Sequence, residues 1–563
     1  MSEEKIYGSK NAPLKVQIIT DPHYYSRTCG TEGKAYKKAE SKSQKVIKDS
    51  DLVIDAAWDM LCKDTSTDIV LLSGDTTKDG EIASHKEFIE KLRELKSRGK
   101  RVYVITSTHD YQDDGLTDGY KGDEKIKVPA ATRDMLWDMY YEFGPNEAIS
   151  YHLPSMSYVV QLCDGYRLFA LNDDRNTDEE GEAKSGFSES CKKWIYEQIE
   201  DAQKNDQYII AMTHHPMLAP SPFYAIIGKG DLQRDHLKNV EEFADRGINC
   251  VFTGHTHIHD ISYRRTEKGN IFYDVSTASL IGYPPTMRTA VFDPANEKIT
   301  VETQFIEQVP GLDTDGKSFP EYIKNFFIGM IGEVLWAAGN DIDRLAEMTD
   351  AFSVPGEKVK KLKFVIKPIG KFLNSLTIGK VGKWTKAETG LKPEDYEDIK
   401  DKKVIDFMLE AVTNLYGGDA PYGPDTREYK IAMGLLSIID SFLDTIGLKI
   451  GKLLKGAENA SSLVEPLFYN SGICDEKAEL KIFPVYKEKN PNPELIEEEK
   501  KSKSEMAVKK SKKGPWILAA LIVLVILLIA IVLGIIGLAV WGIVSLIQLL
   551  IPSMILPFFP GLF

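Results

Sequence analysis

The chain has 563 residues, of which 43% are hydrophobic and 27% are charged, and its formal net charge is −14. These proportions are those of a folded globular protein, and they exclude wholesale disorder and collagen-like repeats. The negative net charge argues against a general nucleic-acid binder, so we expect no nucleic-acid partner. At roughly 150 residues per domain, the length favours three or four domains.

Histidine and charge are distributed unevenly along the chain. All ten histidines lie between His23 and His259, whereas residues 514–563 contain no Asp, Glu, Lys or Arg. The N-terminus has no apolar run of signal-peptide length, so no secretion signal is predicted. The six cysteines have no paired spacing, which is typical of reduced thiols in a cytosolic protein and not of a disulfide framework.

The first 310 residues alternate short apolar runs with segments of helical periodicity. Strands are predicted at 14–19, 68–72, 101–105, 166–171, 208–212 and 248–252. Between them, segments such as 84–97 place apolar residues at helical spacing. This alternation favours a layered α/β fold, and we expect residues 1–310 to form one α/β domain.

Beyond residue 310 the pattern changes to longer helices with Gly and Pro breaks, which predicts an α-helical accessory region over 311–485. Within it, residues 358–386 contain nine lysines and no acid. A surface that faces anionic lipid head groups and an ordinary solvated lysine face are equally compatible with this run. Residues 486–513 are rich in Lys, Glu, Asn and Pro, which is typical of an exposed, charged linker.

The uncharged C-terminal segment, 514–563, has the composition of a membrane anchor. Residues 516–550 are interrupted by only two polar side chains, Ser545 and Gln548. About 20 such residues cross a bilayer as a helix, so one transmembrane helix is predicted. Four lysines precede this run and no charge follows it. The positive-inside rule therefore predicts a single-pass membrane protein whose N-terminal bulk lies on the cytoplasmic side.

Five polar motifs each follow a predicted strand. They are Asp21-Pro-His23, Gly74-Asp75 with Gly80-Glu81, Ser107-Thr108-His109-Asp110, His214-His215-Pro216 and Gly254-His255-Thr256-His257. Because open α/β sheets bind ligands outside the carboxyl ends of their strands, we expect these side chains to converge. Mixed imidazole and carboxylate donors suit Mn, Fe or Zn better than Mg or Ca. Two ions about 3.5–4 Å apart need a bridging carboxylate and a divided set of histidines, and this inventory supplies both.

The ordered set resembles the calcineurin-like metallophosphoesterase superfamily, whose pattern runs D-x-H, G-D-x-x-x-x-G-E, G-N-H-D/E, H-H-P and G-H-x-H. The likeness covers residues 14–306. It implies a layered β-sandwich flanked by helices, two divalent transition-metal ions and phosphoester hydrolysis. One motif departs from the pattern: Thr108 stands where the family has an Asn ligand of the second metal, and Ser107 stands at the glycine before it.

The resemblance also assigns roles to the matching side chains. The implied metal ligands are Asp21, His23 and His257 for one ion, His214 and His255 for the other, and Asp75 as the bridge. Thr108 is a doubtful ligand, because its hydroxyl is shorter and a poorer donor than an amide. The implied catalytic pair is His109, near the leaving group, oriented by Asp110. His215 and His259 adjoin ligands, and we expect them to support those ligands or to face solvent.

Together these features predict a membrane-anchored, metal-dependent phosphohydrolase without an organic cofactor. The anchor favours a phosphodiester or pyrophosphate substrate that is linked to a lipid. A soluble nucleotide or another small phosphodiester is the alternative substrate. Because Thr108 removes an expected ligand, a catalytically weakened binding or scaffold module is a further hypothesis from a different class.

Overall fold

The structure is a computed structural model, and it describes residues 5–175, 185–221, 224–225, 230–350, 356–361, 363–418, 421–445, 458–468 and 473–487. The predicted membrane anchor at 514–563 lies outside the described residues, as does the charged linker after residue 487. Within the described ranges, no helix is both long enough and apolar enough to span a bilayer.

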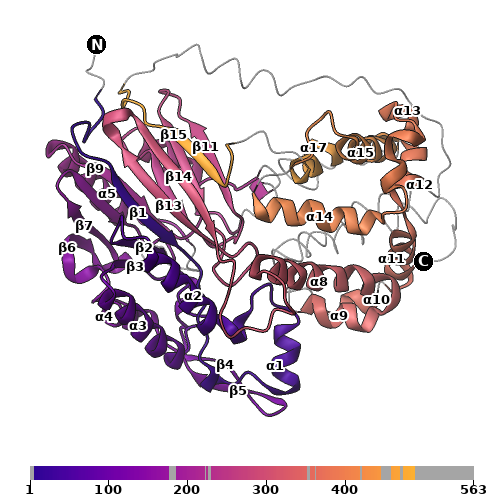
Figure 1. Cartoon of the computed structure of the whole chain (residues 1–563), viewed down its shortest axis with the longest axis horizontal. Coiled ribbons are helices and arrows are strands. Elements are labelled where there is room, and N and C mark those ends of the chain that lie inside the picture. Colours follow the sequence, from indigo (N-terminus) through magenta and orange to yellow (C-terminus); the bar gives the residue numbers. More distant parts are fainter. Residues whose placement is uncertain are drawn as a thin grey trace.

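Two β-sheets form the centre of the N-terminal domain (Figure 1). The first sheet, in the spatial order β15-β14-β13-β1-β2-β3, contains β1 (Leu14–Ile19), β2 (Ile69–Ser73), β3 (Arg101–Ile105), β13 (Thr286–Asp293), β14 (Lys298–Phe305) and β15 (Lys477–Lys481). The second sheet, in the order β11-β12-β10-β9-β8-β7-β6, contains β6 (Ala148–His152), β7 (Ser157–Cys163), β8 (Tyr166–Ala170), β9 (Tyr208–Met212), β10 (Cys250–Thr253), β11 (Asp260–Arg265) and β12 (Ile271–Ser276). A separate hairpin joins β4 (Leu116–Lys121) to β5 (Glu124–Pro129). All six predicted strands are confirmed.

Strand β2 shows how the layers are built. All five of its residues are buried, and successive side chains point to opposite faces of the sheet. Ile69 and Leu71 join the core between the two sheets, whereas Val70 and Leu72 join the core beneath the helices. Helices α2 (Ser50–Lys63) and α3 (Ile82–Ser97) cover the first sheet, and α5 (Glu189–Lys204) and α7 (His236–Ala244) cover the second. The predicted α/β sandwich flanked by helices is therefore confirmed.

The strands that carry the polar motifs are parallel. In the first sheet β1 pairs with β2 and β2 with β3, and in the second β8 pairs with β9 and β9 with β10. Parallel strands end at the same edge of a sheet, so the loops that follow them share one edge of the sandwich. This arrangement brings the motifs together.

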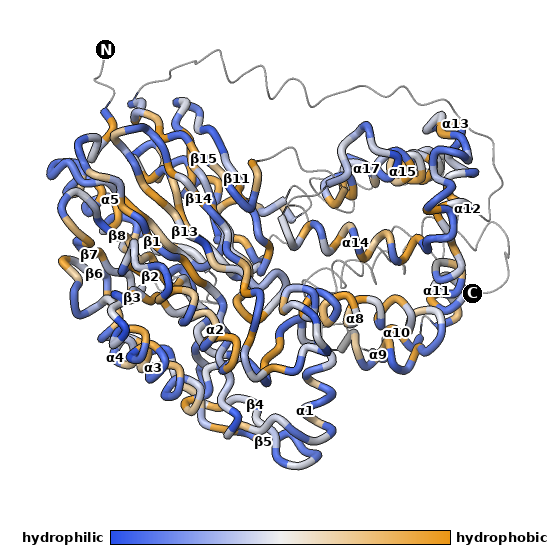
Figure 2. The backbone as a smooth tube through the Cα atoms, in the orientation of Figure 1, coloured by the Kyte–Doolittle hydropathy of each residue, from blue (hydrophilic) through white to orange (hydrophobic). Residues whose placement is uncertain are grey.

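The helical region after residue 310 packs against the α/β domain. Its helices are α8 (Phe319–Asn340), α9 (Ile342–Asp350), α10 (Gly356–Lys361), α11 (Lys363–Ser375), α12 (Ile378–Trp384), α13 (Lys386–Thr389), α14 (Val404–Gly417), α15 (Arg427–Thr445) and α17 (Ala460–Val464). Hydrophobic residues gather along α8 and α14, which lie side by side (Figure 2). Phe327 of α8 contacts Tyr416 of α14 and stacks on Tyr283 of the α/β domain. Ile258 of the α/β domain belongs to the same apolar cluster.

The lysine-rich run forms an exposed face of α10 and α11. Lys361, Lys363, Lys367 and Lys371 are exposed, and Phe364 between them is 62% exposed. Lys360 pairs with Asp343 of α9 at 3.0 Å. The face is solvated as one interpretation expects, and contact with anionic lipid stays a prediction.

The end of the helical region differs from the predicted boundary at residue 485. The chain returns to the first sheet as β15, which pairs antiparallel with β14. The segment Lys477–Lys481 alternates exposed charged residues with buried Ala478 and Leu480, which is the period of a strand. Such a pattern over five residues is too short to separate from a helix end by sequence alone. Residues 477–481 therefore belong structurally to the α/β domain.

Helices α8 and α11 cross at a pair of glycines. A Cβ atom on Gly339 would lie 2.7 Å from the carbonyl carbon of Gly370, and one on Gly370 would lie 2.4 Å from that of Ala338. Only glycine permits backbones to approach this closely. By contrast, a Cβ atom on Gly329 of the same helix α8 would meet no atom within 4 Å.

We expect Gly339→Ala to destabilise the helical region by about 1–3 kcal/mol, because the added methyl group forces the two backbones apart. Gly329→Ala is the matched control and should be neutral or stabilising by up to about 1 kcal/mol, since alanine favours a helix. Urea unfolding followed by far-ultraviolet circular dichroism measures both. Equal effects of the two substitutions would contradict the close crossing.

Candidate metal centre

The motifs meet where the parallel strands end. Asp21 and His23 follow β1, and Asp75 follows β2 in the first sheet. His214 follows β9, and His255 and His257 follow β10 in the second sheet. Donor atoms of Asp21, His23 and His257 lie within 4.8 Å of one another, and so do those of Asp75, His214 and His255. The structure thus brings together all six predicted ligands that carry imidazole or carboxylate groups.

The first cluster consists of Asp21, His23 and His257. Asp21 Oδ1 lies 3.2 Å from His257 Nε2 and 3.4 Å from His23 Nε2. The two Nε2 atoms are 3.2 Å apart. All three side chains are at most 6% exposed. Three donor atoms facing one point in a buried pocket are a suitable set for one divalent ion.

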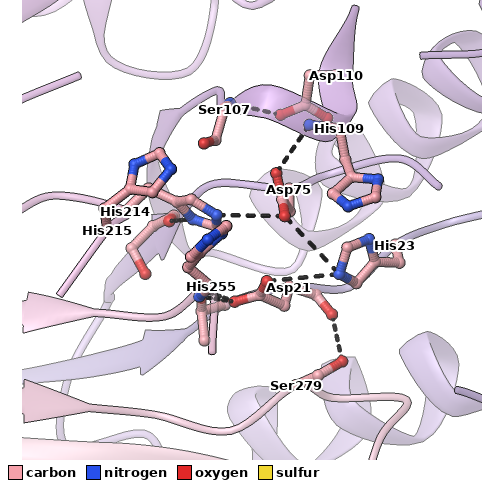
Figure 3. A network of polar contacts seen from close by, with 12 residues as sticks. Asp21, His23, Asp75, Ser107, His109, Asp110, His214, His215, His255 and Ser279 are labelled. Carbon is pink, nitrogen blue, oxygen red and sulfur yellow. Dashed lines mark hydrogen bonds and ion pairs between the residues drawn. The ribbon is translucent and has the colours of Figure 1, made fainter. Parts of the chain in front are cut away.

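Asp75 lies between the two clusters (Figure 3). Its Oδ2 atom is 3.2 Å from His214 Nε2 of the second cluster and 3.9 Å from His23 Nε2 of the first. Its Oδ1 atom accepts a hydrogen bond of 3.1 Å from the backbone N–H of His109. One carboxylate oxygen is therefore placed between histidines of both sets, which is the geometry that a bridging ligand requires.

An unpartnered donor atom tests whether these residues fit a dinuclear centre. His255 Nδ1 is buried without a hydrogen-bond partner, and His214 Nε2 faces the Asp75 carboxylate at 3.2 Å. His214 donates its other ring N–H to the carbonyl oxygen of Ser73 at 2.7 Å, which fixes the ring orientation as in known histidine ligands. A buried polar atom without a partner costs about 1–3 kcal/mol, and a metal ion would satisfy His255 Nδ1. The residues present fit the implied group.

Electrostatics divide the four ligand histidines. Burial lowers the pKa of His23 to about 3 and also lowers the pKa values of His255 and His257, so these imidazoles are neutral and offer lone pairs. Burial opposes the charge of His214 as well, but the carboxylates of Asp75 and Asp21 outweigh it and raise its pKa to about 10.

The two carboxylates of the centre stay ionised. Burial favours their neutral forms, yet the surrounding histidines, His214 foremost, together outweigh burial and hold the pKa values of Asp21 and Asp75 well below the ordinary range. A divalent cation would thus replace a proton held at His214 between two anionic groups.

The backbone at the ligands is strained. Asp21, His23, Asp75, His255 and His257 have φ angles of 49°, 40°, 50°, 66° and 57°. A non-glycine residue in this left-handed region costs about 1–3 kcal/mol and persists only where the surroundings hold it. Here the turns after β1 and β2 hold each other, because the N–H groups of Asp21 and His23 donate to the carbonyl oxygens of Gly74 and Asp75.

Two glycines make room for the centre. A Cβ atom on Gly74, whose φ is 103°, would lie 2.5 Å from His214 Nδ1. A Cβ atom on Gly254 would lie 2.3 Å from Asp21 Oδ2. Any side chain at either position would displace a predicted ligand.

His109 lies beside the centre, but Asp110 does not orient its ring. His109 Nδ1 is 2.6 Å from the carbonyl oxygen of Lys78 and 3.1 Å from Asp79 Oδ1. Both partners are acceptors, so Nδ1 carries the proton and Nε2 is free. Asp110 instead accepts hydrogen bonds from the backbone N–H groups of Ser107 and Thr77 and from the Thr76 hydroxyl. The predicted orienting role therefore passes to Asp79, which lies inside the second motif.

Partial burial opposes the charge of His109, while the carboxylates of Asp75 and Asp79 raise its pKa above the ordinary value. The ring packs edge-on against that of His23, with the centroids 4.9 Å apart. Its side chain is 39% exposed. His109 is thus a partly exposed proton carrier next to the first cluster, in the position that a general acid needs.

In the motif that departs from the family pattern, Ser107 and Thr108 differ in burial. Thr108 is exposed. Ser107 is buried, its Oγ atom has no hydrogen-bond partner, and it lies with His214 against Gly74. Of the two residues, Ser107 has the hydroxyl that is buried beside the second cluster. The assignment of Thr108 as a ligand stays a prediction.

Three residues that lie outside the five motifs contact the histidines of the site. Asp173 accepts a hydrogen bond from the His214 backbone and lies 3.2 Å from His215 Nδ1, so His215 supports a ligand, as expected. Lys45 Nζ lies 3.1 Å from His23 Nε2, and Gln44 Nε2 lies 3.2 Å from His257 Nδ1. Their loop follows no predicted strand, so nothing in the sequence placed them at the site.

Comparison with known proteins gives one family match and distant similarities to solved structures. Residues 14–259 match the family model of calcineurin-like phosphoesterases. No curated protein matches. Among solved structures, a dimetal phosphatase from Danio rerio is 14% identical, covers 52% of this chain and 96% of its own, and has a TM-score of 0.38. A NAD nucleotidase from Haemophilus influenzae is 12% identical, covers 65% of this chain and 62% of its own, and has a TM-score of 0.28.

We expect His109→Gln to lower kcat by about 10²–10⁴-fold, because it removes the proton carrier beside the centre. Asp79→Asn should lower kcat less, since the Lys78 carbonyl oxygen still holds the ring. Asp110→Asn should mainly lower the melting temperature, because an amide replaces a carboxylate that accepts several hydrogen bonds and one of its atoms can no longer accept. Turnover of bis(4-nitrophenyl) phosphate and thermal unfolding measure these effects. A larger loss of turnover in Asp110→Asn than in Asp79→Asn, at unchanged stability, would return the orienting role to Asp110.

The match to the family model and the converging ligands concern the same part of the chain. The family model covers the five motifs up to His259, and the structure brings their side chains into three overlapping clusters, of which the third consists of His23, Asp75 and His109. Residues 14–259 therefore match the calcineurin-like phosphoesterase family in sequence and in the clustering of the motif side chains, which supports a phosphoester hydrolase.

Proposed function

We propose that this protein is a membrane-attached phosphohydrolase that uses two transition-metal ions, Mn, Fe or Zn, to cleave a phosphodiester or pyrophosphate. The placement of Asp75 Oδ2 between His23 and His214 carries the proposal, because a shared carboxylate is what a two-metal centre requires. Bound ions would supply a water of lowered pKa and neutralise charge on the phosphate.

The residues around the centre have separate tasks in this reaction. Asp21, His23 and His257 would hold one ion, and His214 and His255 the other, with Asp75 shared. Asp173 and the Ser73 carbonyl oxygen keep His214 in position. His109 is held through Nδ1 by Lys78 and Asp79, and one of its ring nitrogens lies within 4.8 Å of donor atoms of His23 and Asp75. From there it can protonate the leaving oxygen, and Asp79 stabilises its protonated form.

The charge around the centre favours a diester over a monoester. A monoester carries close to two negative charges at neutral pH, whereas a diester carries one. Apart from the ligands, the cationic groups that contact the centre are Lys45 and His109. Among the described residues, no arginine pairs with a carboxylate of either cluster. A soluble nucleotide or small phosphodiester fits this charge as well as a lipid-linked substrate does.

The membrane part of the proposal depends on residues 516–550, which lie outside the described residues. Their length and composition suit one bilayer span. The lysines before the run support a cytoplasmic orientation of the α/β domain. An enzyme tethered there meets lipid-linked phosphoesters at high local concentration, which supports a lipid-linked substrate.

A metal screen tests the catalytic proposal. The purified protein, stripped with chelator and reloaded with Mn, Fe, Co or Zn, should bind about two ions per chain and hydrolyse diesters or pyrophosphates faster than monoesters. Asp75→Asn should reduce both metal content and turnover, because the bridging ligand loses its charge. His152→Gln, a histidine distant from the centre, serves as the control. Full metal loading without turnover of any phosphoester would favour a binding or scaffold module instead.

Cell fractionation tests the membrane proposal. The full chain should stay in the membrane fraction after washing with high salt and carbonate, because an apolar span is not held by charge. A chain that ends at Lys513 should become extractable. Protease added to intact spheroplasts should leave the α/β domain uncut if that domain faces the cytoplasm. Extraction of the full chain by salt alone would refute an integral anchor.

A further inference from the structure

Two partly exposed cationic side chains, His109 and Lys45, lie beside the metal centre. The ligand side chains of the first cluster and Asp75 are at most 6% exposed. His109 is 39% exposed, and Lys45 is partly exposed. Both contact His23, one through its ring and the other through Nζ. These two cationic groups are therefore accessible to a phosphate from solvent.

Lys45 is held at this position by its loop. After α1 (Gly33–Glu40) the chain turns back, and the N–H of Val46 donates to the carbonyl oxygen of Ile281 at 2.9 Å. The nearby Ser279 hydroxyl donates to the carbonyl oxygen of Asp21, so the loop and the first cluster share one support. Gln44, the preceding residue, contacts the outer nitrogen of His257. These contacts hold the backbone of the loop around Lys45 beside the first cluster.

The same loop is braced from the helical region. Lys38 on α1 pairs with the Glu347 carboxylate of α9 at 3.5 Å, and Lys42 donates to the Glu347 carbonyl oxygen. These contacts fix both the helix before the loop and its first turn. The lysine is therefore presented to the centre by contacts with two different parts of the fold.

The hydrogen-bonding capacity of Lys45 is mostly unused. An ammonium group has three N–H donors and no acceptor. In the described part of the chain, the only hydrogen-bond partner recorded for Nζ is His23 Nε2, and no carboxylate pairs with Lys45 within 4.0 Å. A cationic group with spare donors beside an anion-processing site is complementary to a phosphate oxygen.

We propose that Lys45 binds a non-bridging oxygen of the substrate phosphate and positions it over the metal centre. This inference rests on the proposed phosphohydrolase function. It assigns to Lys45 a contact with the substrate, whereas the six ligands contact metal. The loop around residues 41–46 is then a phosphate-binding element outside the five motifs, supported by α9 of the helical region.

Inorganic phosphate is a suitable probe, because it binds without turnover. Calorimetric titration of the metal-loaded full chain compares Lys45→Met, which keeps the length and removes the charge, with Lys45→Arg, which keeps the charge. Lys48→Met, an exposed lysine just beyond the same loop, is the matched control. Metal content of each variant is measured in parallel by mass spectrometry.

Lys45→Met should weaken phosphate binding roughly 10- to 100-fold, the usual effect of losing a hydrogen bond to a charged group. Metal content should not change, Lys45→Arg should recover part of the affinity, and Lys48→Met should resemble the unmodified protein. For any ester that is turned over, KM should rise more than kcat falls.

Three results would overturn the assignment. If Lys45→Met binds metal more tightly and phosphate equally well, the lysine only balances the charge of Asp21 and Asp75. If metal content falls, the lysine supports the centre itself. If Lys45→Met and Lys48→Met behave alike, the contact has no role in binding. Failure of the proposed function is separate: phosphate binding that depends on Lys45, without turnover of any ester, would keep this assignment and reject catalysis.

Discussion

The carboxylate of Asp75 is the interaction on which the rest of the site depends. It comes from the first sheet, and its Oδ2 atom lies against His214 from the second sheet and His23 from the first. Its position is therefore set by the packing of one sheet on the other. The apolar core between the sheets, with Ile69 and Leu71 on the same strand, fixes this packing. The apolar core between the sheets is therefore needed to keep Asp75 in contact with His214.

The strained backbone at the ligands persists because the turns that carry the ligands hold each other in place. Five ligand residues adopt left-handed backbone angles, and each alone would favour a different local conformation. The turn after β1 is hydrogen-bonded to the turn after β2, so neither relaxes without the other. Buried like charges add to the cost, since Asp21 and Asp75 lie in one pocket with only imidazoles between them. Metal binding would relieve the repulsion, and it would thereby stabilise the fold as well as activate water.

The strands and the metal-ligand motifs could be predicted from the sequence, because each has a pattern of its own. The apolar run of β9 and the alternating apolar residues of β1 are why these strands, like β3, were predicted with their observed bounds. The six ligands were found because rare residue types recur in a known order. Asp79, Asp173 and Lys45 were not found, because their roles depend on which side chain the fold places opposite them. Asp110 was given a role that belongs to Asp79, since adjacency in sequence does not show which carboxylate faces a ring.

The helical region also takes part in shaping the site, although it supplies no ligand. The carbonyl oxygen of Tyr416, near the end of α14, accepts the backbone N–H of His259, two residues after the ligand His257. Ile258 between them is fully buried in the apolar cluster of the helical region. On the other side of the centre, Glu347 of α9 holds the helix and loop that carry Lys45. The helices therefore contact both the metal-binding turn and the lysine loop, and a change in their packing would alter the distance between the two. The helical region therefore supports the geometry of the site, although the five motifs all lie in the α/β domain.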